Sequence, residues 1–259
     1  MNAVNKTLYI PLYGKAYVSH RGILLEDAMA ETIWDAEGFP LKGKAKSKWL
    51  AYYLGMRSAV FDRWALGQME KHPEAVVLHV GCGLDSRCIR VGCRGHLWYD
   101  VDVPDVIQVR KRYFAETEHY HMMGFDIRQA GWLSGIPAGR TAIILLEGVS
   151  MYLKPEERMA VLQQWKQHFG EVRVLMDVYT AFGARASRYK NPIHQVGAKE
   201  VFGLDDPKVL EAAGLCFVQE HALTPEWLIA QLPNREQGIF RCLFGGKPAQ
   251  KICRLYEYR

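Results

Sequence analysis

Two glycines and an aspartate follow apolar runs at a spacing that suits a ligand site. Gly81 and Gly83 come directly after the run Val76 to Val80, and Asp102 ends a second apolar run 19 residues after Gly83. A glycine turn after a strand lets a ligand approach the backbone, and an acid about 20 residues further on can reach the hydroxyls of a ribose. The spacing therefore predicts a βαβ unit that receives a nucleotide-like ligand at its first turn.

The residues behind this turn favour one kind of ligand. A dinucleotide site carries a third glycine three residues after the second, where this chain has Ser86, and Asp85 would place a carboxylate against a pyrophosphate. S-adenosylmethionine has no phosphate, and its amino acid and ribose groups tolerate acidic neighbours. We therefore expect S-adenosylmethionine as the cofactor, and a nicotinamide-dependent oxidoreductase is the weaker alternative.

Asp100 competes with Asp102 for the ribose, because residues two apart point to the same side of a strand. We prefer Asp102, since it stands at the end of the strand, where ligands bind in sheets of this kind. The alternative for Asp102 is a solvated acid that caps the helix expected from Pro104 onward.

Acidic residues also end two later apolar runs. Asp126, followed by Ile127, could accept the amino proton of an adenine while the isoleucine packs on the ring. Glu147 ends the aliphatic run Ala142 to Leu146. An unpaired buried carboxylate there would cost several kcal/mol, so Glu147 meets either a ligand or a structural ion pair. We prefer the ligand.

Alternating apolar strands and helices must position these residues. The apolar positions from Trp49 to Gln68 recur every three and four residues, which predicts a long amphipathic helix. The alternation predicts an α/β fold with a doubly wound, Rossmann-like sheet whose ligand lies at the carboxyl ends of the strands. The expected strands are Val76 to Val80, Leu97 to Val101, the run ending at Asp126, Ala142 to Leu146, Val172 to Val178 and the run LCFVQEHAL.

The ends of the chain are expected to add to this core. Pro11 and Gly14 interrupt the stretch Thr7 to Trp34, which predicts a looped arm followed by a helix. The tail segments IFRCLFG and KICRLYEYR are expected to form a final strand, or a hairpin, at the edge of the sheet. We expect an N-terminal arm with helices over residues 1–70, and one catalytic domain over residues 71–259 with an inserted cover at about 180–204.

The composition excludes several classes of protein. The chain is 49% apolar and 24% charged, without a run of 18 apolar residues, so we expect no membrane segment. Its start lacks a secretory signal, which predicts a cytoplasmic location. The net charge of +5 suits an anionic acceptor, and no basic block is dense enough for nucleic acid; the segment KGKAKSK is expected to be a solvated loop. The six cysteines contain no C-x-x-C pair, so we expect free thiols and no metal.

Several segments taken together resemble a known family. They are GCGLDSR, YDVDVPDVIQVR and EGVSMYL, with IPLYGKA and YLGMRSAVFD ahead of them. In this order they look like the leucine carboxyl methyltransferase family, especially its bacterial branch similar to tetracenomycin-type polyketide O-methyltransferases. The similarity runs from about Thr7 to Tyr152 and more loosely to Gly214. It implies a class I methyltransferase fold that uses S-adenosylmethionine.

The resemblance also implies roles for single residues. Arg57 would pair with the carboxylate of the methyl donor, with Lys15 as a second cation for that group; an ion pair of Arg57 with Asp62 is the alternative. Glu147 would meet the amino end of the donor. The residues implied at the donor are Lys15, Arg57, Gly81, Gly83, Asp102, Asp126, Ile127 and Glu147.

The methyl acceptor is less determined by the sequence. The chain is compact, with little room for the large insertion by which eukaryotic members of the family recognise a protein carboxyl terminus. We therefore expect an anionic or aromatic small molecule, such as a polyketide, methylated on a carboxylate or hydroxyl. A carboxylate needs no base, whereas a hydroxyl would benefit from Tyr152, Tyr179 or His194. A protein carboxyl terminus as acceptor, or a non-catalytic donor-binding module, are the alternatives.

Overall fold

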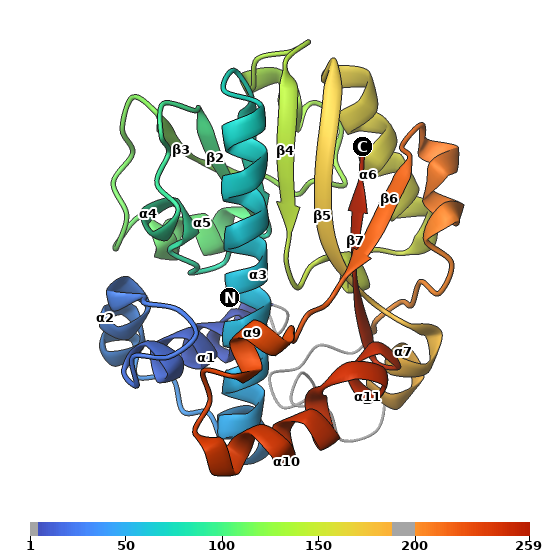
Figure 1. The fold of residues 1–259 in the computed structure, drawn as a ribbon. Coiled ribbons are helices and arrows are strands. Elements are labelled where there is room, and N and C mark those ends of the chain that lie inside the picture. Colours follow the sequence, from blue (N-terminus) through green and yellow to red (C-terminus); the bar gives the residue numbers. More distant parts are fainter. Residues whose placement is uncertain (1–4, 188–199) are drawn as a thin grey trace.

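The computed structural model describes residues 5–187 and 200–259, and its strands form one sheet (Figure 1). The order across the sheet is β3-β2-β1-β4-β5-β7-β6. Neighbours from β3 to β5 pair in parallel, and β7 is antiparallel to both β5 and β6. The strands are β1 (Val76–Val80), β2 (Trp98–Asp102), β3 (Tyr120–Gly124), β4 (Thr141–Leu146), β5 (Glu171–Tyr179), β6 (Phe217–His221) and β7 (Cys253–Tyr258). The predicted α/β fold with a doubly wound, Rossmann-like sheet is confirmed.

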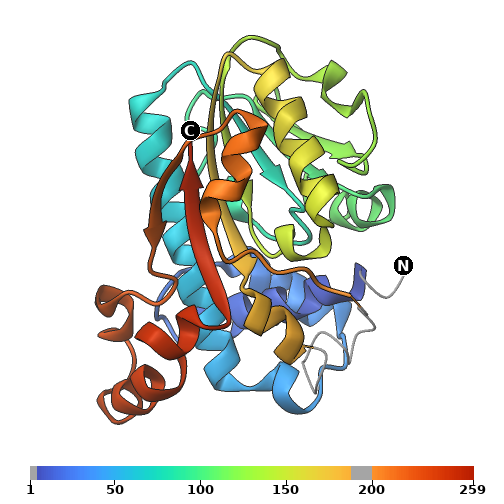
Figure 2. The same ribbon diagram turned by 90° about the vertical axis from the view of Figure 1, so that its right-hand side faces the viewer.

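Two hydrophobic clusters cover the two faces of this sheet. The helix α3 (Lys48–Lys71) lies on one face and α6 (Pro155–His168) on the other (Figures 1 and 2). Val77 packs in the cluster that contains α3, whereas Val76 and Leu78 pack in the cluster that contains α6. Because side chains alternate across a strand, β1 is buried at every position, which explains its almost unbroken apolar run.

Further helices extend this core. They are α1 (Tyr9–Ser19), α2 (Ala28–Glu37), α4 (Arg87–Arg90), α5 (Pro104–Arg110), α7 (Ala181–Ser187), α9 (Glu226–Ile229), α10 (Asn234–Phe244) and α11 (Gly246–Gln250), with 3₁₀ turns η1 (Asn5–Leu8), η2 (Gly43–Lys46), η3 (Trp132–Gly135), η4 (Ser150–Tyr152) and η5 (Pro207–Ala213). None of the helices within the described ranges is both long and apolar enough to cross a membrane.

Helices from both halves of the chain gather at one end of the sheet. Figures 1 and 2 show α1, α2, α7, α10 and α11 at the end to which the parallel strands point. In open α/β sheets this end, outside the carboxyl ends of the strands, is where ligands bind.

The N-terminal arm is helical, so the looped arm predicted from Pro11 and Gly14 was wrong. Both residues lie within α1. Pro11 occupies the first turn, where a backbone N–H has no acceptor inside the helix, so its missing N–H costs little. A Cβ atom on Gly14 would lie 2.9 Å from Cβ of Leu54, so this glycine lets α1 pack closely against α3.

The prediction for the tail was wrong in two respects. Residues 239–245 lie in and just after α10 rather than in a strand. Within α10, the rings of Phe240 and Phe244 stack with centroids 5.4 Å apart, as residues one helical turn apart can. The strand β7 does form from the last segment, but it is inserted between β5 and β6 instead of standing at the edge. The edge strand next to β7 is β6.

Candidate active site

A cavity of about 860 Å³ lies at the carboxyl ends of the parallel strands. Its walls come from α1 and α3, from the ends of β1, β2, β4 and β5, and from α7, α10 and α11. The residues predicted for the donor, which all line this one cavity, are Lys15, Arg57, Gly81, Gly83, Asp102, Asp126, Ile127 and Glu147.

The glycine turn follows β1 and requires glycine at its first position. Gly81 and Gly83 have φ angles of 68° and 53°, in the left-handed region that side chains disfavour. A Cβ atom on Gly81 would lie 2.1 Å from Cγ2 of Val149, so no larger residue fits there. The turn thereby brings bare backbone to the cavity wall.

Asp102 ends β2 and reaches back to the glycine turn. Its Oδ2 accepts a hydrogen bond from the backbone N–H of Gly83 at 2.8 Å, and its Oδ1 accepts one from Val103 N–H at 2.8 Å. Desolvation raises the pKa of Asp102 to about 6, although these two N–H groups oppose the shift. The residue does not cap α5, whose N-cap position is Val103 without a side-chain cap.

Asp100, the competitor of Asp102, is fully buried and serves the core. It accepts hydrogen bonds from Tyr120 Oη at 2.7 Å and Trp98 Nε1 at 2.8 Å, and it pairs with the Arg110 guanidinium. Burial alone would raise the pKa of Asp100, but Arg110 holds it at about 2. Among the described residues that line the cavity, Asp102 is present and Asp100 is not.

The two residues that the sequence assigns to an adenine, Asp126 and Ile127, follow β3. Asp126 lines the cavity with a side chain 23% exposed and binds Arg128 Nη2 at 2.6 Å. The hydrogen bonds from Arg128 lower the pKa of Asp126, so its carboxylate is ionised at neutral pH. Ile127 beside it is buried and packs in the cluster that contains α6.

Arg57 projects from α3 into a pair of carboxylates. Its Nε lies 3.1 Å from Oε1 of Glu147, and its Nη1 lies 2.7 Å from Oδ2 of Asp177. The alternative partner, Asp62, pairs instead with Arg87 at 2.6 Å and with Arg90 at 2.8 Å. Arg57 therefore belongs to the wall of the cavity and not to an ion pair along its own helix.

Glu147 lies between two guanidinium groups. It pairs with Arg57 and with Arg87, and its side chain is only 5% exposed. Burial would raise the pKa of Glu147, but Arg87 and Arg57 hold it at about 2. The ion pair that the sequence left as the weaker alternative is thus present, on a residue that also lines the cavity.

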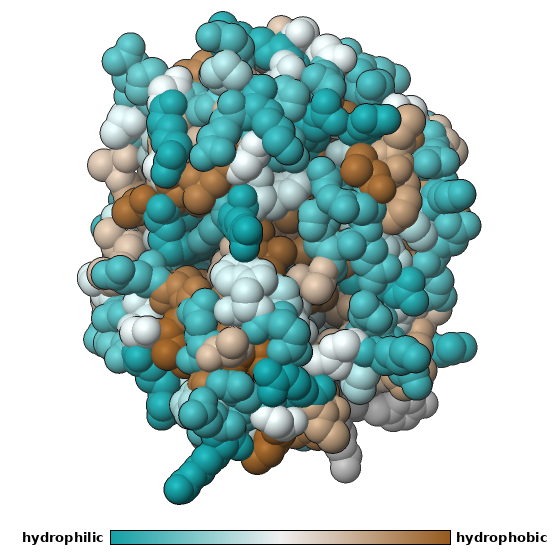
Figure 3. All heavy atoms as spheres, viewed as in Figure 1, coloured by the Kyte–Doolittle hydropathy of each residue, from teal (hydrophilic) through white to brown (hydrophobic). Residues whose placement is uncertain are grey.

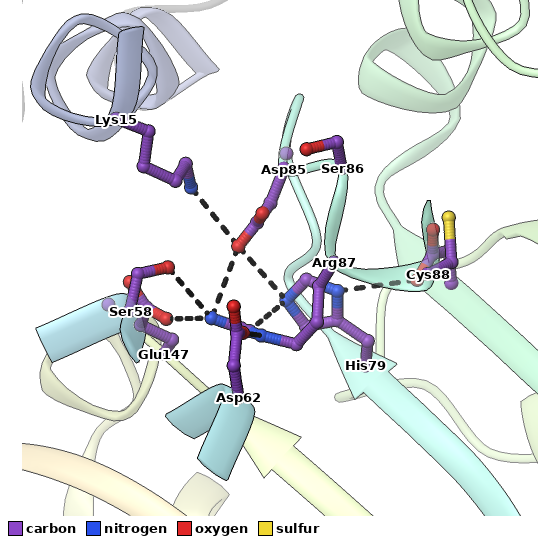
Figure 4. A network of polar contacts seen from close by, with 12 residues as sticks. Lys15, Ser58, Asp62, His79, Asp85, Ser86, Arg87, Cys88 and Glu147 are labelled. Atoms are coloured by element: carbon purple, nitrogen blue, oxygen red, sulfur yellow. Dashed lines mark hydrogen bonds and ion pairs between the residues drawn. The ribbon is translucent and has the colours of Figure 1, made fainter. Parts of the chain in front are cut away.

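A network of charges at Asp85 ties α1 to the glycine turn (Figure 4). Asp85 Oδ2 lies 3.1 Å from Nζ of Lys15 and 3.3 Å from Nη2 of Arg87, and its Oδ1 lies 2.8 Å from Nη1 of Arg90. Lys15 is 3% exposed, so this pair is shielded from water. The second cation predicted for the donor therefore faces the cavity while held by a carboxylate.

Sequence reasoning missed Asp177 and Arg87, which do not line the cavity but pair with Arg57 and Glu147 in its wall. Asp177 is fully buried, binds Arg57, and accepts a hydrogen bond from the N–H of Gly148 at 2.6 Å. Asp177 carries a weaker form of the signal that marked Glu147: it is an acid that follows the apolar run Val174 to Met176 near the end of β5. Nothing in the spacing distinguishes Arg87 from exposed arginines.

The wall presents cations and carboxylates side by side. Lys15 and Arg57 lie near Asp85, Glu147 and Asp102 around one cavity. The amino acid part of S-adenosylmethionine carries both an ammonium and a carboxylate, and its sulfonium adds a positive charge, so this mixture of charges fits it. A pyrophosphate carries only negative charge, so the carboxylates of Asp85, Glu147 and Asp102 would oppose its binding, and this mixture of charges suits it less.

The candidate bases differ in placement. Tyr152 and Tyr179 line the cavity. Burial raises the pKa of Tyr152 to about 12, so its phenol is protonated at neutral pH. His194 and residues 188–199 of the expected cover lie outside the described residues.

The basic segment KGKAKSK partly forms η2 and only touches the site. Lys44 is exposed, as expected of a solvated segment, yet it stands among the residues that line the cavity. Ala45 next to it is buried and packs with side chains of α1 and α3.

Comparison with known proteins gives consistent relatives. The sequence pattern of the leucine carboxyl methyltransferase family matches residues 9–166. The chain is 34% identical over 186 residues to the tetracenomycin polyketide synthesis O-methyltransferase TcmP of Streptomyces glaucescens, a match that covers 71% of this chain and 69% of the relative. It is 27% identical over 183 residues to the S-adenosyl-L-methionine-dependent methyltransferase dpfgK of Gibberella zeae, covering 65% and 61% of the two chains.

Solved structures show the same fold at lower identity. One of them is magnesium protoporphyrin IX methyltransferase from Synechocystis PCC 6803 with bound SAH (S-adenosylhomocysteine). It matches with a TM-score of 0.52 and 15% identity, and the match covers 88% of this chain and 92% of that one.

Proposed function

The chain belongs to the leucine carboxyl methyltransferase family and is an S-adenosylmethionine-dependent methyltransferase, and we propose that it methylates a carboxylate or hydroxyl oxygen of a small organic molecule. The bound donor supplies an already activated methyl group. The protein must therefore align the acceptor oxygen with that group and keep water out, and proximity accounts for much of the rate.

The observation that carries this proposal is the extent of the cavity. Following the sheet from β3 towards β7, the wall passes Asp126, Asp102, the glycine turn and Glu147, and then continues to Tyr179 and Ile252. Pockets for single small molecules measure about 300–1,000 Å³. A cavity of about 860 Å³ lies in the upper part of this range, which supports room for an acceptor beside the donor.

We assign the donor's parts along the same path. Asp126 and Ile127 would hold the adenine and Asp102 the ribose. The glycine turn and Glu147 would hold the amino acid part, with its carboxylate towards Arg57 and Lys15. In this arrangement residues 1–70 close the donor site, and residues 71–259 form the catalytic domain around it.

A carboxylate acceptor would need no base, and the protonated phenol of Tyr152 suits such an acceptor. A carboxylate is ionised at neutral pH, so Tyr152 would only have to donate a hydrogen bond that orients it. A bound donor would supply its sulfonium methyl group to the acceptor oxygen, and the electron pair of the broken carbon–sulfur bond would stay on sulfur. A hydroxyl acceptor would also have to lose its proton.

One of the relatives supports the class of the acceptor. The relative from Streptomyces glaucescens is a polyketide O-methyltransferase, and 71% of this chain matches it. We propose a polyketide or a comparable secondary metabolite as the acceptor class.

A mass-spectrometric screen tests the proposal. The protein is incubated with S-adenosylmethionine and a panel of small aromatic carboxylic acids and phenols, with peptides bearing a free carboxyl terminus as the comparison. We expect at least one small molecule to gain one methyl group, and Asp102→Ala is the control that should methylate it more slowly at low donor concentration. Methylation of the peptides alone would contradict a small-molecule acceptor.

A further inference from the structure

We propose that the helical segment between β6 and β7 forms the acceptor-binding wall, and that Leu243, Phe244 and Ile252 select acceptors with an apolar body. The inference rests on the proposed function, because it takes the donor to occupy the end of the cavity at the glycine turn. It assigns the other end to a part of the chain outside the residues 9–166 that match the family.

The segment lies across the sheet from the proposed donor residues. It runs from His221, the end of β6, to Cys253, the start of β7, and folds into α9, α10 and α11. In the sheet, β4 and β5 separate β7 from β1 and β2, which carry the glycine turn and Asp102. Among the strands that line the cavity, β7 is therefore the one furthest in the sheet from β2, and Ile252 and Cys253 lie at its start.

The lining contributed by this segment is entirely apolar. It consists of Leu243, Phe244, Ala249, Ile252 and Cys253. The charged residues that line the cavity lie mainly at the other end, around Asp85 and Glu147. An acceptor that is apolar over most of its surface, with one reactive oxygen pointing towards the donor, matches this division.

One face of the helix α10 is anchored to α3, and the neighbouring face is exposed to water. Glu236 accepts a hydrogen bond from Tyr52 Oη at 2.7 Å and pairs with Lys48 Nζ at 2.8 Å, both in α3. Phe240, one turn later, is fully buried. The neighbouring face of the same helix exposes 49% of Ile239 and 55% of Leu243. Figure 3 shows apolar side chains emerging among polar ones over this lower part of the molecule.

Ile252 is fixed from the opposite side by α7. Its carbonyl accepts a hydrogen bond from Thr180 N–H at 3.1 Å, and a Cβ atom on Gly183 would lie 2.1 Å from the same oxygen. The backbone of Ile252 is thus clamped, yet its side chain is 47% exposed.

Leu243 is therefore a large apolar side chain that both lines the cavity and faces water, as is Ile252. Covering such side chains with the apolar part of a ligand releases their hydration and favours binding. A fixed wall achieves this with little ordering cost.

Calorimetry with two model acids tests this wall. The acids are titrated into the 259-residue chain saturated with SAH. Benzoic acid and 2-naphthoic acid carry the same carboxylate and differ by one fused ring. We expect the second ring to tighten binding about tenfold in the wild type, from the extra apolar area it buries.

The matched variants are Leu243→Asp and Ile239→Asp. Both positions are exposed on α10, one turn apart, but Ile239 does not line the cavity. Leu243→Asp should reduce the gain from the second ring to less than about twofold, whereas Ile239→Asp should keep it. Both variants should bind SAH like the wild type, which shows that they fold.

Absence of a gain in the wild type, or an equal loss in the two variants, would overturn the acceptor wall. If SAH still binds in that case, the proposed function stands. A wild type that does not bind SAH would overturn both.

Discussion

Arg87 is the residue on which the charged network near the glycine turn converges. Its guanidinium is fully buried and reaches Asp62 at 2.6 Å, Asp85 at 3.3 Å and Glu147. It also contacts His79 Nε2 at 2.9 Å. A buried guanidinium persists only with such partners, so this one side chain joins α3, the turn after β1 and the end of β4.

Replacing Arg87 should destabilise the fold. Arg87→Met leaves three carboxylates without their shared cation, and we expect it to lower the free energy of unfolding by about 3–5 kcal/mol. Urea denaturation measures this difference. The control is Arg241→Met, which breaks an exposed pair with Glu226 and should leave the midpoint almost unchanged. Equal midpoints for the two variants would contradict the structural role of Arg87.

The raised pKa of Asp102 predicts a pH dependence of donor binding. An ionised Asp102 can accept hydrogen bonds from a ribose, and a protonated one loses most of this capacity. Because the pKa of Asp102 is about 6, affinity for SAH should be full above that pH and should fall by up to about tenfold for each pH unit below it. Glu147, with a pKa of about 2, does not titrate in this window.

Calorimetry from about pH 5 to about pH 8 checks the profile. Asp102→Asn is the control, since an amide does not titrate there and should give weaker but nearly pH-independent binding. A falling affinity in the asparagine variant would assign the titration to another group.

At the level of residues, the sequence predicted which residues line the cavity better than it predicted their ion-pair partners. Asp102 and Glu147 could be found because acids at the ends of apolar strands must face an opening or a counter-charge. Arg87 could not be found, since its inward direction depends on Asp62 in α3 and on Glu147 after β4, which only the folded chain brings together. Asp177 could have been found by the rule that found Glu147.

Among the elements, the contact of α1 with α3 shows how a glycine can act inside a helix. Gly14 would place a Cβ atom 2.9 Å from Leu54, and Gly55 would place one 2.9 Å from Cγ2 of Val18. The two helices therefore approach each other at small residues on both sides. This contact holds α1, and with it Lys15, over the glycine turn.

Two glycine-to-alanine variants separate packing from helix propensity. Gly14→Ala should lower the free energy of unfolding by about 1–3 kcal/mol, because the added methyl overpacks the contact with Leu54. Gly67→Ala, in α3 with nothing within 4 Å of the new methyl, should raise it by about 0.5–1 kcal/mol. Thermal unfolding measures both. A stabilising Gly14→Ala would show that α1 and α3 are not in close contact.

The elements that were predicted wrongly depend on contacts in the folded chain that the local sequence does not reveal. Pro11 and Gly14 read as interruptions because the sequence does not reveal that one lies in a first turn and the other at a helix contact. The run IFRCLFG is too short for its apolar period to separate a helix from a strand. Where β7 lies depends on pairing with β5 and β6, which are distant in sequence from each other. The strands β1 and β4 were the most predictable, because each is an almost unbroken buried apolar run.

In the whole molecule, segments from the beginning, middle and end of the chain meet at one cavity. Lys15 and Arg57 come from the N-terminal helices, the glycine turn and Asp102 from the core, and Leu243 from the segment before the last strand. The sequence predicted the first two contributions from strand ends and from the family resemblance. It missed the third, because that segment was taken for a strand.

The most direct test of this account is the binding of SAH and NAD to the full-length chain, measured as a shift in unfolding. SAH at about 100 times its Kd should raise the free energy of unfolding by about 2.7 kcal/mol, and NAD at the same concentration should leave it unchanged. Asp102→Ala should weaken SAH binding by about 1.5–3 kcal/mol, as loss of a charge-assisted hydrogen bond does. No shift with SAH, or an equal shift with NAD, would contradict a methyl-donor site at the glycine turn.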